Sequence, residues 1–181
     1  PVTLETLVQG TEALIRSQVK GDFQLYDASW LSGGASKLQM RFQLKWDQPG
    51  VGPTTSTMVL RMEPSESIVE TSRLREFQII KAMEGTVPVP PAFWIDEDGT
   101  FLPYPAIVYG FATGVPKPTT GSSGVTGVGT YIPPELRPVL GKQFIDYYAA
   151  IHNFDWSKSP HLSAFDPVGP GTQAVELQLN W

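Results

Sequence analysis

The stretch Leu31-Ser32-Gly33-Gly34-Ala35-Ser36 separates two segments that have the pattern of β-strands. Residues 23–30 before it are short and aromatic, and residues 37–44 after it alternate apolar and polar side chains, as a half-buried strand does. A third strand is expected at 57–62, after a loop rich in proline and glycine at 47–53. Together these segments predict an antiparallel meander whose first hairpin carries a glycine turn.

Helices and two further strands are expected around this meander. Residues 1–20 have helical spacing, and apolar side chains recur every three residues between 67 and 84, which predicts a helix packed on the sheet through this stripe. The stripe consists of Leu74, Phe77, Ile80 and Met83. Strands at 93–95 and 106–109, joined by a turn at 96–99, would complete a five-stranded sheet.

The chain divides into three parts by composition. Residues 1–111 hold the sheet and its helices, residues 112–132 are rich in Gly, Thr, Ser and Pro and are expected to form a linker or loop, and residues 133–181 are expected to be helical. Apolar positions at helical spacing predict helices at 134–154 and from Thr172 onward. The last pattern reaches Trp181 without a helix-ending signal, so we expect a truncated chain whose exposed helices favour self-association.

Composition excludes several classes of protein. The chain has 181 residues, 41% of them apolar, with a net charge of -5 and a pI near 5.0, which disfavours a nucleic-acid binder. No apolar run reaches the roughly 18 residues that a membrane helix needs. Because the chain has no cysteine, it has no disulfide, no zinc-thiolate site and no cysteine nucleophile. We expect a cytoplasmic protein.

Three features together could bind a triphosphate. Backbone N–H groups of the turn Gly33-Gly34-Ala35-Ser36 could approach phosphate oxygens, and the Ser36 hydroxyl could add a donor. Arg61 ends an apolar strand, where a cation could contact phosphates, and Glu76 on the next helix could hold Arg61 in place. Taken singly, each has an ordinary alternative: a hairpin turn, an edge arginine and a solvated helix carboxylate. Other possible partners in this pairing are Glu70, Arg73 and Arg75.

The order of these features resembles the aminoglycoside phosphotransferase family, kinase-like enzymes that phosphorylate small molecules, and in particular the branch found beside or fused to acyl-CoA dehydrogenases. The resemblance covers residues 25–157 and is carried by residues 31–36, 59–61, 74–77, 87–90, 107–114 and 149–155. It implies an α+β fold: a protein-kinase-like N-lobe with a five-stranded antiparallel sheet and a packed helix, followed by the first helices of an α-helical C-lobe. Residues 1–111 would then be the nucleotide-binding N-lobe and residues 112–132 the hinge and linker.

The resemblance also implies a role for each matching residue. Residues 33–36 would cover the phosphates of a nucleotide, Arg61 would contact them, and Glu76 would position Arg61. Tyr109, Gly110 and Phe111 would form the hinge that binds the adenine edge through backbone groups. Many members of the family carry lysine where this chain has Arg61, and arginine binds phosphate as a fork rather than as a point charge.

The implied activity is an ATP-dependent phosphotransfer, with Mg²⁺, to the hydroxyl of a small molecule that the sequence does not identify. The family takes its base and its metal ligands from a His-Gly-Asp loop and a later acidic motif, and neither occurs in these 181 residues. We therefore expect no catalytic and no metal-binding residue here, and no activity of this chain alone. His152 and Asp155 mimic part of the loop, but Pro160 stands where it needs Asn, so we expect a local structural role for His152.

Two other interpretations stay open. A kinase-like lobe could bind a nucleotide or a partner without catalysis, or the glycines and the arginine could be incidental features of an α+β domain. The sequence that follows Trp181 in the natural protein would separate the first alternative from an enzyme, because a catalytic loop there would supply the missing base.

Overall fold

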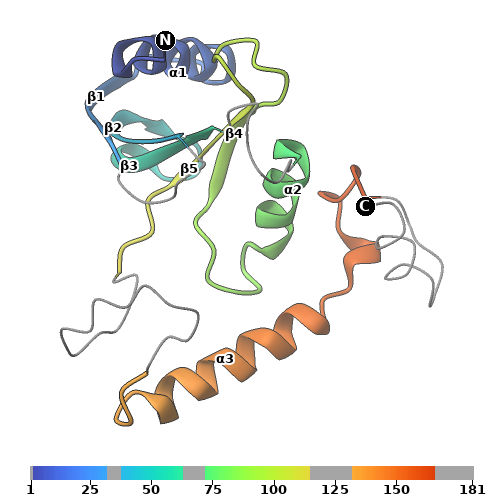
Figure 1. Cartoon of the computed structure of the whole chain (residues 1–181). Coiled ribbons are helices and arrows are strands. Elements are labelled where there is room, and N and C mark those ends of the chain that lie inside the picture. The colour runs from blue at the N-terminus through green and yellow to red at the C-terminus, as the bar shows by residue number, and fades with distance from the viewer. Residues whose placement is uncertain (1, 32–37, 63–71, 115–131, 166–181) are drawn as a thin grey trace.

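The computed structural model describes residues 2–31, 38–62, 72–114 and 132–165 (Figure 1). In chain order its elements are α1 (Leu4–Gln18), β1 (Gln24–Trp30), β2 (Leu38–Gln48), β3 (Gly52–Met62), α2 (Arg73–Met83), β4 (Ala92–Asp96), β5 (Ala106–Gly110), α3 (Arg137–His152) and a short 3₁₀ turn at Trp156–Lys158. The strands form one antiparallel sheet in the order β1-β2-β3-β5-β4, so the predicted meander and five-stranded sheet are confirmed.

The hairpin of β2 and β3 is longer than the sequence suggested. The loop predicted at 47–53 is present but shorter, because β2 continues to Gln48 and β3 begins at Gly52, which is its direct partner. Gly50 and Gly52 take positive φ angles of 77° and 94°, which allows the chain to reverse sharply between the strands. The polar residues at 54–57 concealed the start of β3, because they give no alternation of apolar and polar side chains.

The register divides the sheet into two faces. On the α1 face, Met40 and Phe42 of β2 pair directly with Leu60 and Met58 of β3, and all four are fully buried. These side chains belong to one hydrophobic cluster with α1. The cluster consists of Leu7, Leu14, Ile15, Met40, Phe42, Leu44, Trp46, Met58, Leu60, Met62, Leu102, Ala106 and Val108. The opposite side of the sheet, the α2 face, carries the odd-numbered residues of β2 and β3.

Helix α1 is fixed against the sheet at both its start and its middle. Thr3 begins the helix with a capping box, in which its hydroxyl accepts from the Thr6 backbone N–H at 3.2 Å. In the middle, Gly10 lies so close to the loop after β4 that an added Cβ would stand 2.5 Å from the Phe101 carbonyl oxygen. Glycine therefore allows the close approach of the helix and this loop.

The connection between β4 and β5 is longer than the turn predicted at 96–99. Asp96 is the last residue of β4, and its buried carboxylate accepts backbone N–H bonds from Thr100, Phe101 and Leu102 at 2.8–2.9 Å. A buried carboxylate is tolerated where several donors compensate the lost hydration. Asp96 thus organises a loop that covers the end of the hydrophobic cluster.

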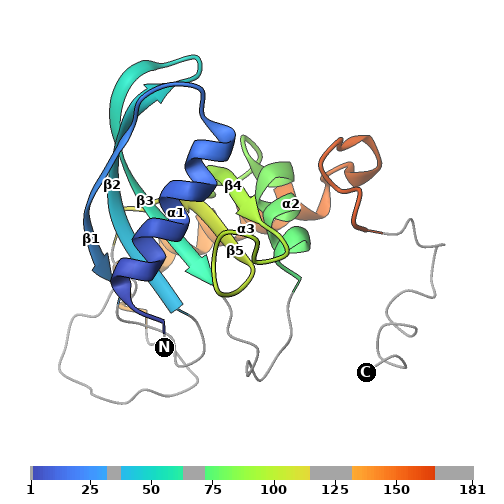
Figure 2. The ribbon, with the colours of Figure 1, turned by 90° about the horizontal axis from the view of Figure 1, so that it is seen from above.

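Helix α2 lies across the sheet from α1, beside β4 and β5 (Figure 2). Ser72 caps its start by accepting from the Arg75 backbone N–H at 3.2 Å. The predicted helix is present, but its predicted packing stripe at 74, 77, 80 and 83 is only half-buried. The buried residues are Arg73, Gln78 and Ala82. Arg73 and Gln78 are buried by polar contacts with neighbouring segments, which the apolar stripe did not predict.

Helix α3 was predicted at 134–154 and spans Arg137–His152. None of its residues is buried, and large apolar side chains such as Phe144 and Tyr148 are exposed. Self-association through such helices stays a prediction, and the helix expected from Thr172 lies outside the described residues. No helix in the described part of the chain is both long and apolar enough to cross a membrane.

Candidate functional site

Arg61 lies on the α2 face near one end of the sheet. It is the penultimate residue of β3, where Gln39 of β2 and Ile107 of β5 are its direct neighbours. Its side chain points away from the hydrophobic cluster, because the flanking Leu60 and Met62 fill that cluster. The alternation of β3 therefore directs a cation to the face that α2 only partly covers.

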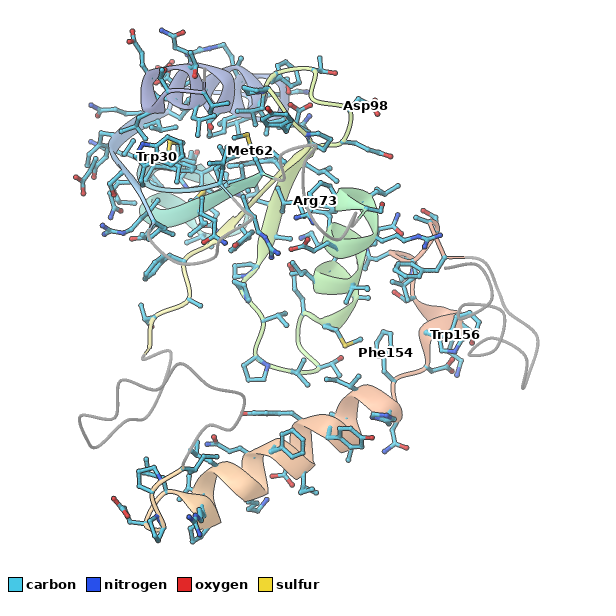
Figure 3. All side chains as sticks on the ribbon, viewed as in Figure 1. Trp30, Met62, Arg73, Asp98, Phe154 and Trp156 are labelled. Atoms are coloured by element: carbon cyan, nitrogen blue, oxygen red, sulfur yellow. The ribbon has the colours of Figure 1, made fainter. Side chains whose placement is uncertain are left out.

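Glu76 binds Arg61, as the sequence predicted. The Nη1 group of Arg61 donates to Glu76 Oε1 at 2.5 Å, and the two side chains are 24% and 20% exposed. The second carboxylate oxygen of Glu76 lies 2.6 Å from Nη1 of Arg73, whose side chain is only 2% exposed. Figure 3 labels Arg73 at the start of α2 and Met62 at the end of β3. One carboxylate thus joins a strand arginine and a helix arginine.

Arg61, Arg73 and Glu76 form one charged cluster. Among the described residues it combines two guanidinium groups with one carboxylate, in a chain whose net charge is -5. The Nε–H of Arg61 is buried and has no hydrogen-bond partner among the described residues. A partly buried cationic cluster with an unused donor is suited to bind an anion.

Tyr109 completes this cluster from β5. It pairs with Val59, so its side chain lies on the same face as Arg61. Burial raises the pKa of the Tyr109 phenol above its usual 10.0, while the charge of Arg61 and a hydrogen bond to it act in the opposite direction. The phenol is therefore neutral at physiological pH.

A third arginine lies on this face of the sheet. Arg41 of β2 pairs with Val59 and is thus diagonal to Arg61 across the β2–β3 ladder. Its guanidinium lies 5.6 Å from the centre of the Phe111 ring, just after β5. We did not anticipate Arg41 or the burial of Arg73 from the sequence. Strand alternation places Arg41 on the same side of β2 as Gln39, but the pairing of Gln39 with Arg61 appears only with the register.

The glycine turn at Gly33, Gly34, Ala35 and Ser36 lies outside the described residues. The ends of the strands that flank it are described: the Leu31 N–H donates to the Gln39 carbonyl at 2.9 Å, and Gln39 is the direct neighbour of Arg61. The strand ends that flank residues 32–37 therefore lie at the end of the sheet that carries Arg61. Its predicted contact with phosphate stays a prediction.

The predicted hinge, Tyr109, Gly110 and Phe111, is at the other end of β5. The Gly110 N–H donates to the Pro91 carbonyl and the Phe111 N–H to the Thr57 carbonyl, each at 2.9 Å. Both N–H groups are bonded to backbone carbonyls, so neither donates to a nucleobase in this structure. Gly110 also has a packing role, since an added Cβ would stand 3.0 Å from Pro91.

In the described part of the chain, the other candidate groups do not form a second site. His152 Nδ1 lies 2.8 Å from the Tyr148 carbonyl oxygen on its own helix, which confirms the local role, and His161 is exposed. Among the described residues no three His, Asp or Glu side chains are grouped to hold a metal ion. A shallow groove between Phe23 and Trp46 lies at the opposite end of the β2–β3 hairpin from Arg61.

Comparisons with known proteins support the fold. No known sequence family and no curated protein matches the chain. A crystal structure described as that of a "putative aminoglycoside phosphotransferase", from Ralstonia eutropha JMP134, matches with a TM-score of 0.59 and 19% identity. The match covers 96% of this chain and 46% of that protein, so the chain spans about half the length of its structural neighbour. The chain thus has the mixed α/β fold of a kinase-like N-lobe, with a five-stranded antiparallel sheet and packed helices.

Proposed function

We propose that this chain is the nucleotide-binding part of an ATP-dependent phosphotransferase that acts on the hydroxyl of a small molecule. The observation that carries the proposal is the ion pair of Arg61 and Glu76 on the α2 face of the sheet. The family that the sequence resembles and the name of the structural neighbour both point to phosphotransfer, but neither identifies an acceptor.

The charges of the site suit the phosphates of ATP. Glu76 accepts from one nitrogen of Arg61 and so fixes the guanidinium, while the buried Nε–H of Arg61 has no described partner and could donate to a phosphate oxygen. Arg73 contacts the other carboxylate oxygen of Glu76, so Glu76 is held in place beside Arg61. A triphosphate beside Arg61 would extend toward the glycine turn, whose flanking strand ends lie at the same end of the sheet.

The adenine would lie toward the end of β5, beyond Tyr109. Phe111 and Arg41 present an aromatic ring and a guanidinium there, and both groups can stack on a purine. Because the amides of Gly110 and Phe111 are already paired, other backbone groups of the hinge segment would contact the base edge. We expect Mg²⁺ to accompany the nucleotide, although the described residues do not provide a metal site of their own.

In the proposed reaction, the acceptor oxygen forms a bond to the γ-phosphorus of ATP while the bond from this phosphorus to the β–γ bridging oxygen breaks. The hydroxyl proton passes to a base, and ADP leaves. The role of this chain is to bind and orient ATP. Since the 181 residues contain no His-Gly-Asp sequence, we expect them to bind ATP without turnover, and measurable phosphotransfer by the chain alone would contradict this assignment.

Isothermal titration with Mg-ATP tests the proposal, with GTP and AMP for comparison. Arg61→Ala should raise the Kd for Mg-ATP about tenfold or more, because hydrogen bonds to charged groups are worth about 1.5–3 kcal/mol. The matched control is Arg16→Ala, which removes an exposed arginine of α1 on the other side of the sheet. Arg73 is not a neutral control, because it shares Glu76 with Arg61.

Two results would overturn the proposal. The first is that the wild-type chain binds neither Mg-ATP nor GTP. The second is that Arg61→Ala and Arg16→Ala bind Mg-ATP equally well, since the nucleotide would then lie elsewhere. If the natural full-length protein binds ATP through Arg61 but transfers no phosphoryl group, the non-catalytic binding module becomes the better interpretation.

A further inference from the structure

Three consecutive residues after α3, Ser163, Ala164 and Phe165, contact α2; we call this segment the strap. The Arg75 Nε–H donates to the Ala164 carbonyl at 3.2 Å, and the Arg75 guanidinium lies 5.5 Å from the centre of the Phe165 ring. In Figures 1 and 2 the chain that follows α3 runs alongside α2. The contact joins residues that are 89 positions apart in the sequence.

Gln78 binds the strap with both ends of its side-chain amide. Its Nε2 group donates to the Ser163 hydroxyl at 2.9 Å, and its Oε1 accepts from the Ala164 backbone N–H at 2.9 Å. Gln78 is only 8% exposed, so these bonds are largely shielded from water. Burying a side-chain amide without hydrogen-bond partners costs free energy. Gln78 therefore favours the arrangement in which the strap supplies these partners.

The strap and the ion pair hold opposite sides of α2. At about 100° per residue, the direction between Arg75 and Gln78 is about 160° away from the direction between Arg73 and Glu76. Only Arg73, Gln78 and Ala82 are buried on this helix, and its larger apolar side chains are half-buried or exposed. Polar contacts therefore hold its first two turns on both sides.

We propose that the strap is a positioning element: by binding Arg75 and Gln78, it holds α2 where Glu76 reaches Arg61. The segment thereby couples the region after α3 to the cationic cluster on the sheet. The structural part of this inference is independent of the nucleotide. Its consequence for affinity rests on the proposed function.

Hydrogen exchange of Gln78→Ala tests the structural part. The substitution removes both amide bonds to the strap, so the α2 amides should exchange about five- to hundredfold faster, while those of the β2–β3 hairpin stay near wild type. Ala164→Pro is a second variant, which deletes the strap donor without changing α2. Gln143→Ala, on an exposed face of α3, is the matched control and should leave α2 unchanged.

A variant that destabilises the protein without releasing α2 from the strap should give a different pattern of hydrogen exchange. Leu14→Ala weakens the hydrophobic cluster through α1, so it should speed exchange in the hairpin at least as much as in α2. The buried Nε–H of Arg61 gives a direct signal by NMR: its exchange with water should accelerate in Gln78→Ala, as in a Glu76→Gln reference. If Gln78→Ala leaves α2 within about twofold of wild type, or frees α2 without affecting Arg61, the proposal is wrong.

Affinity for Mg-ATP then separates this inference from the proposed function. Gln78→Ala should raise the Kd even though Gln78 does not contact the cationic cluster. If the wild-type chain binds no nucleotide, the proposed function fails while the exchange results still decide on the strap. If wild type and Gln78→Ala bind Mg-ATP equally while Arg61→Ala binds weakly, the proposed function stands and the strap does not position the site.

Discussion

Replacing Glu76 by Gln removes the charge that joins Arg61 and Arg73 while it keeps the size of the side chain. The Arg73 side chain is 2% exposed, so after the substitution a nearly buried guanidinium loses this carboxylate, which lies 2.6 Å away. Removing one partner of a buried ion pair costs about 3–5 kcal/mol. The side chains of Glu76 and Arg61 are 20% and 24% exposed, so water partly screens their charges. We therefore expect Glu76→Gln to lower the unfolding free energy by about 2–3 kcal/mol, less than for a fully buried pair.

Urea unfolding followed by tryptophan fluorescence measures this loss, and thermal unfolding should show a Tm decrease of about 4–12 °C at about 2–4 °C per kcal/mol. Glu97→Gln is the matched control, because Glu97 is exposed after β4. The difference between the two variants should persist at about 1 M salt, where only exposed charges are fully screened. A loss below about 0.5 kcal/mol for Glu76→Gln would refute the view that the cluster is a buried electrostatic unit.

The remaining predictions concern the scaffold and the phenol. Gly10→Ala should destabilise the protein by about 1–3 kcal/mol in urea unfolding, because the added Cβ would stand 2.5 Å from the Phe101 carbonyl oxygen. A higher unfolding free energy, as the better helix propensity of alanine alone would give, would contradict this packing. Asp96→Asn should lower the unfolding free energy by about 1–3 kcal/mol in the same assay, because the carboxylate that accepts three backbone N–H bonds is lost. An unchanged urea midpoint would show that the asparagine amide can replace the carboxylate as acceptor for these N–H groups. The pKa of Tyr109 is raised in the folded state, so this phenol contributes stability that is full below pH 10.0 and is lost as pH rises through the folded-state pKa. In urea unfolding over this pH range, wild type should therefore lose more unfolding free energy than Tyr109→Phe. Parallel pH profiles of the two proteins would contradict this.

Local pattern was sufficient for the strands and for the central pair of the site. The alternation in 37–44 predicted β2, and the order of a strand cation and a helix carboxylate indicated Glu76 as one possible partner of Arg61, a contact now seen at 2.5 Å. Both features depend on short segments whose side-chain directions follow from strand and helix periodicity. The start of β3 was missed because its first residues are polar on both faces.

The inward face of α2 could not be read from its apolar residues. The sequence favoured the stripe that contains Leu74 and Phe77, whereas the buried positions include Arg73 and Gln78. Ion pairs and amide hydrogen bonds decide the orientation, and the partner of Gln78 lies 85 residues away in the strap. A contact of such sequence separation leaves no periodic signal in either segment. The same holds for the diagonal placement of Arg41 beside Arg61, which requires the register.

The central claim, that the α2 face of the sheet binds a nucleotide through Arg61, is tested most directly by titrating the isotope-labelled chain with Mg-ATP and following each backbone amide by NMR. We predict shifts that cluster at Arg41, Arg61, Tyr109 and Phe111, with little change in α1 on the opposite side of the sheet. The same titration of Arg61→Ala should require a higher ATP concentration for the same shifts. Shifts confined to α1 or to the groove near Trp46, or none at all, would contradict the claim.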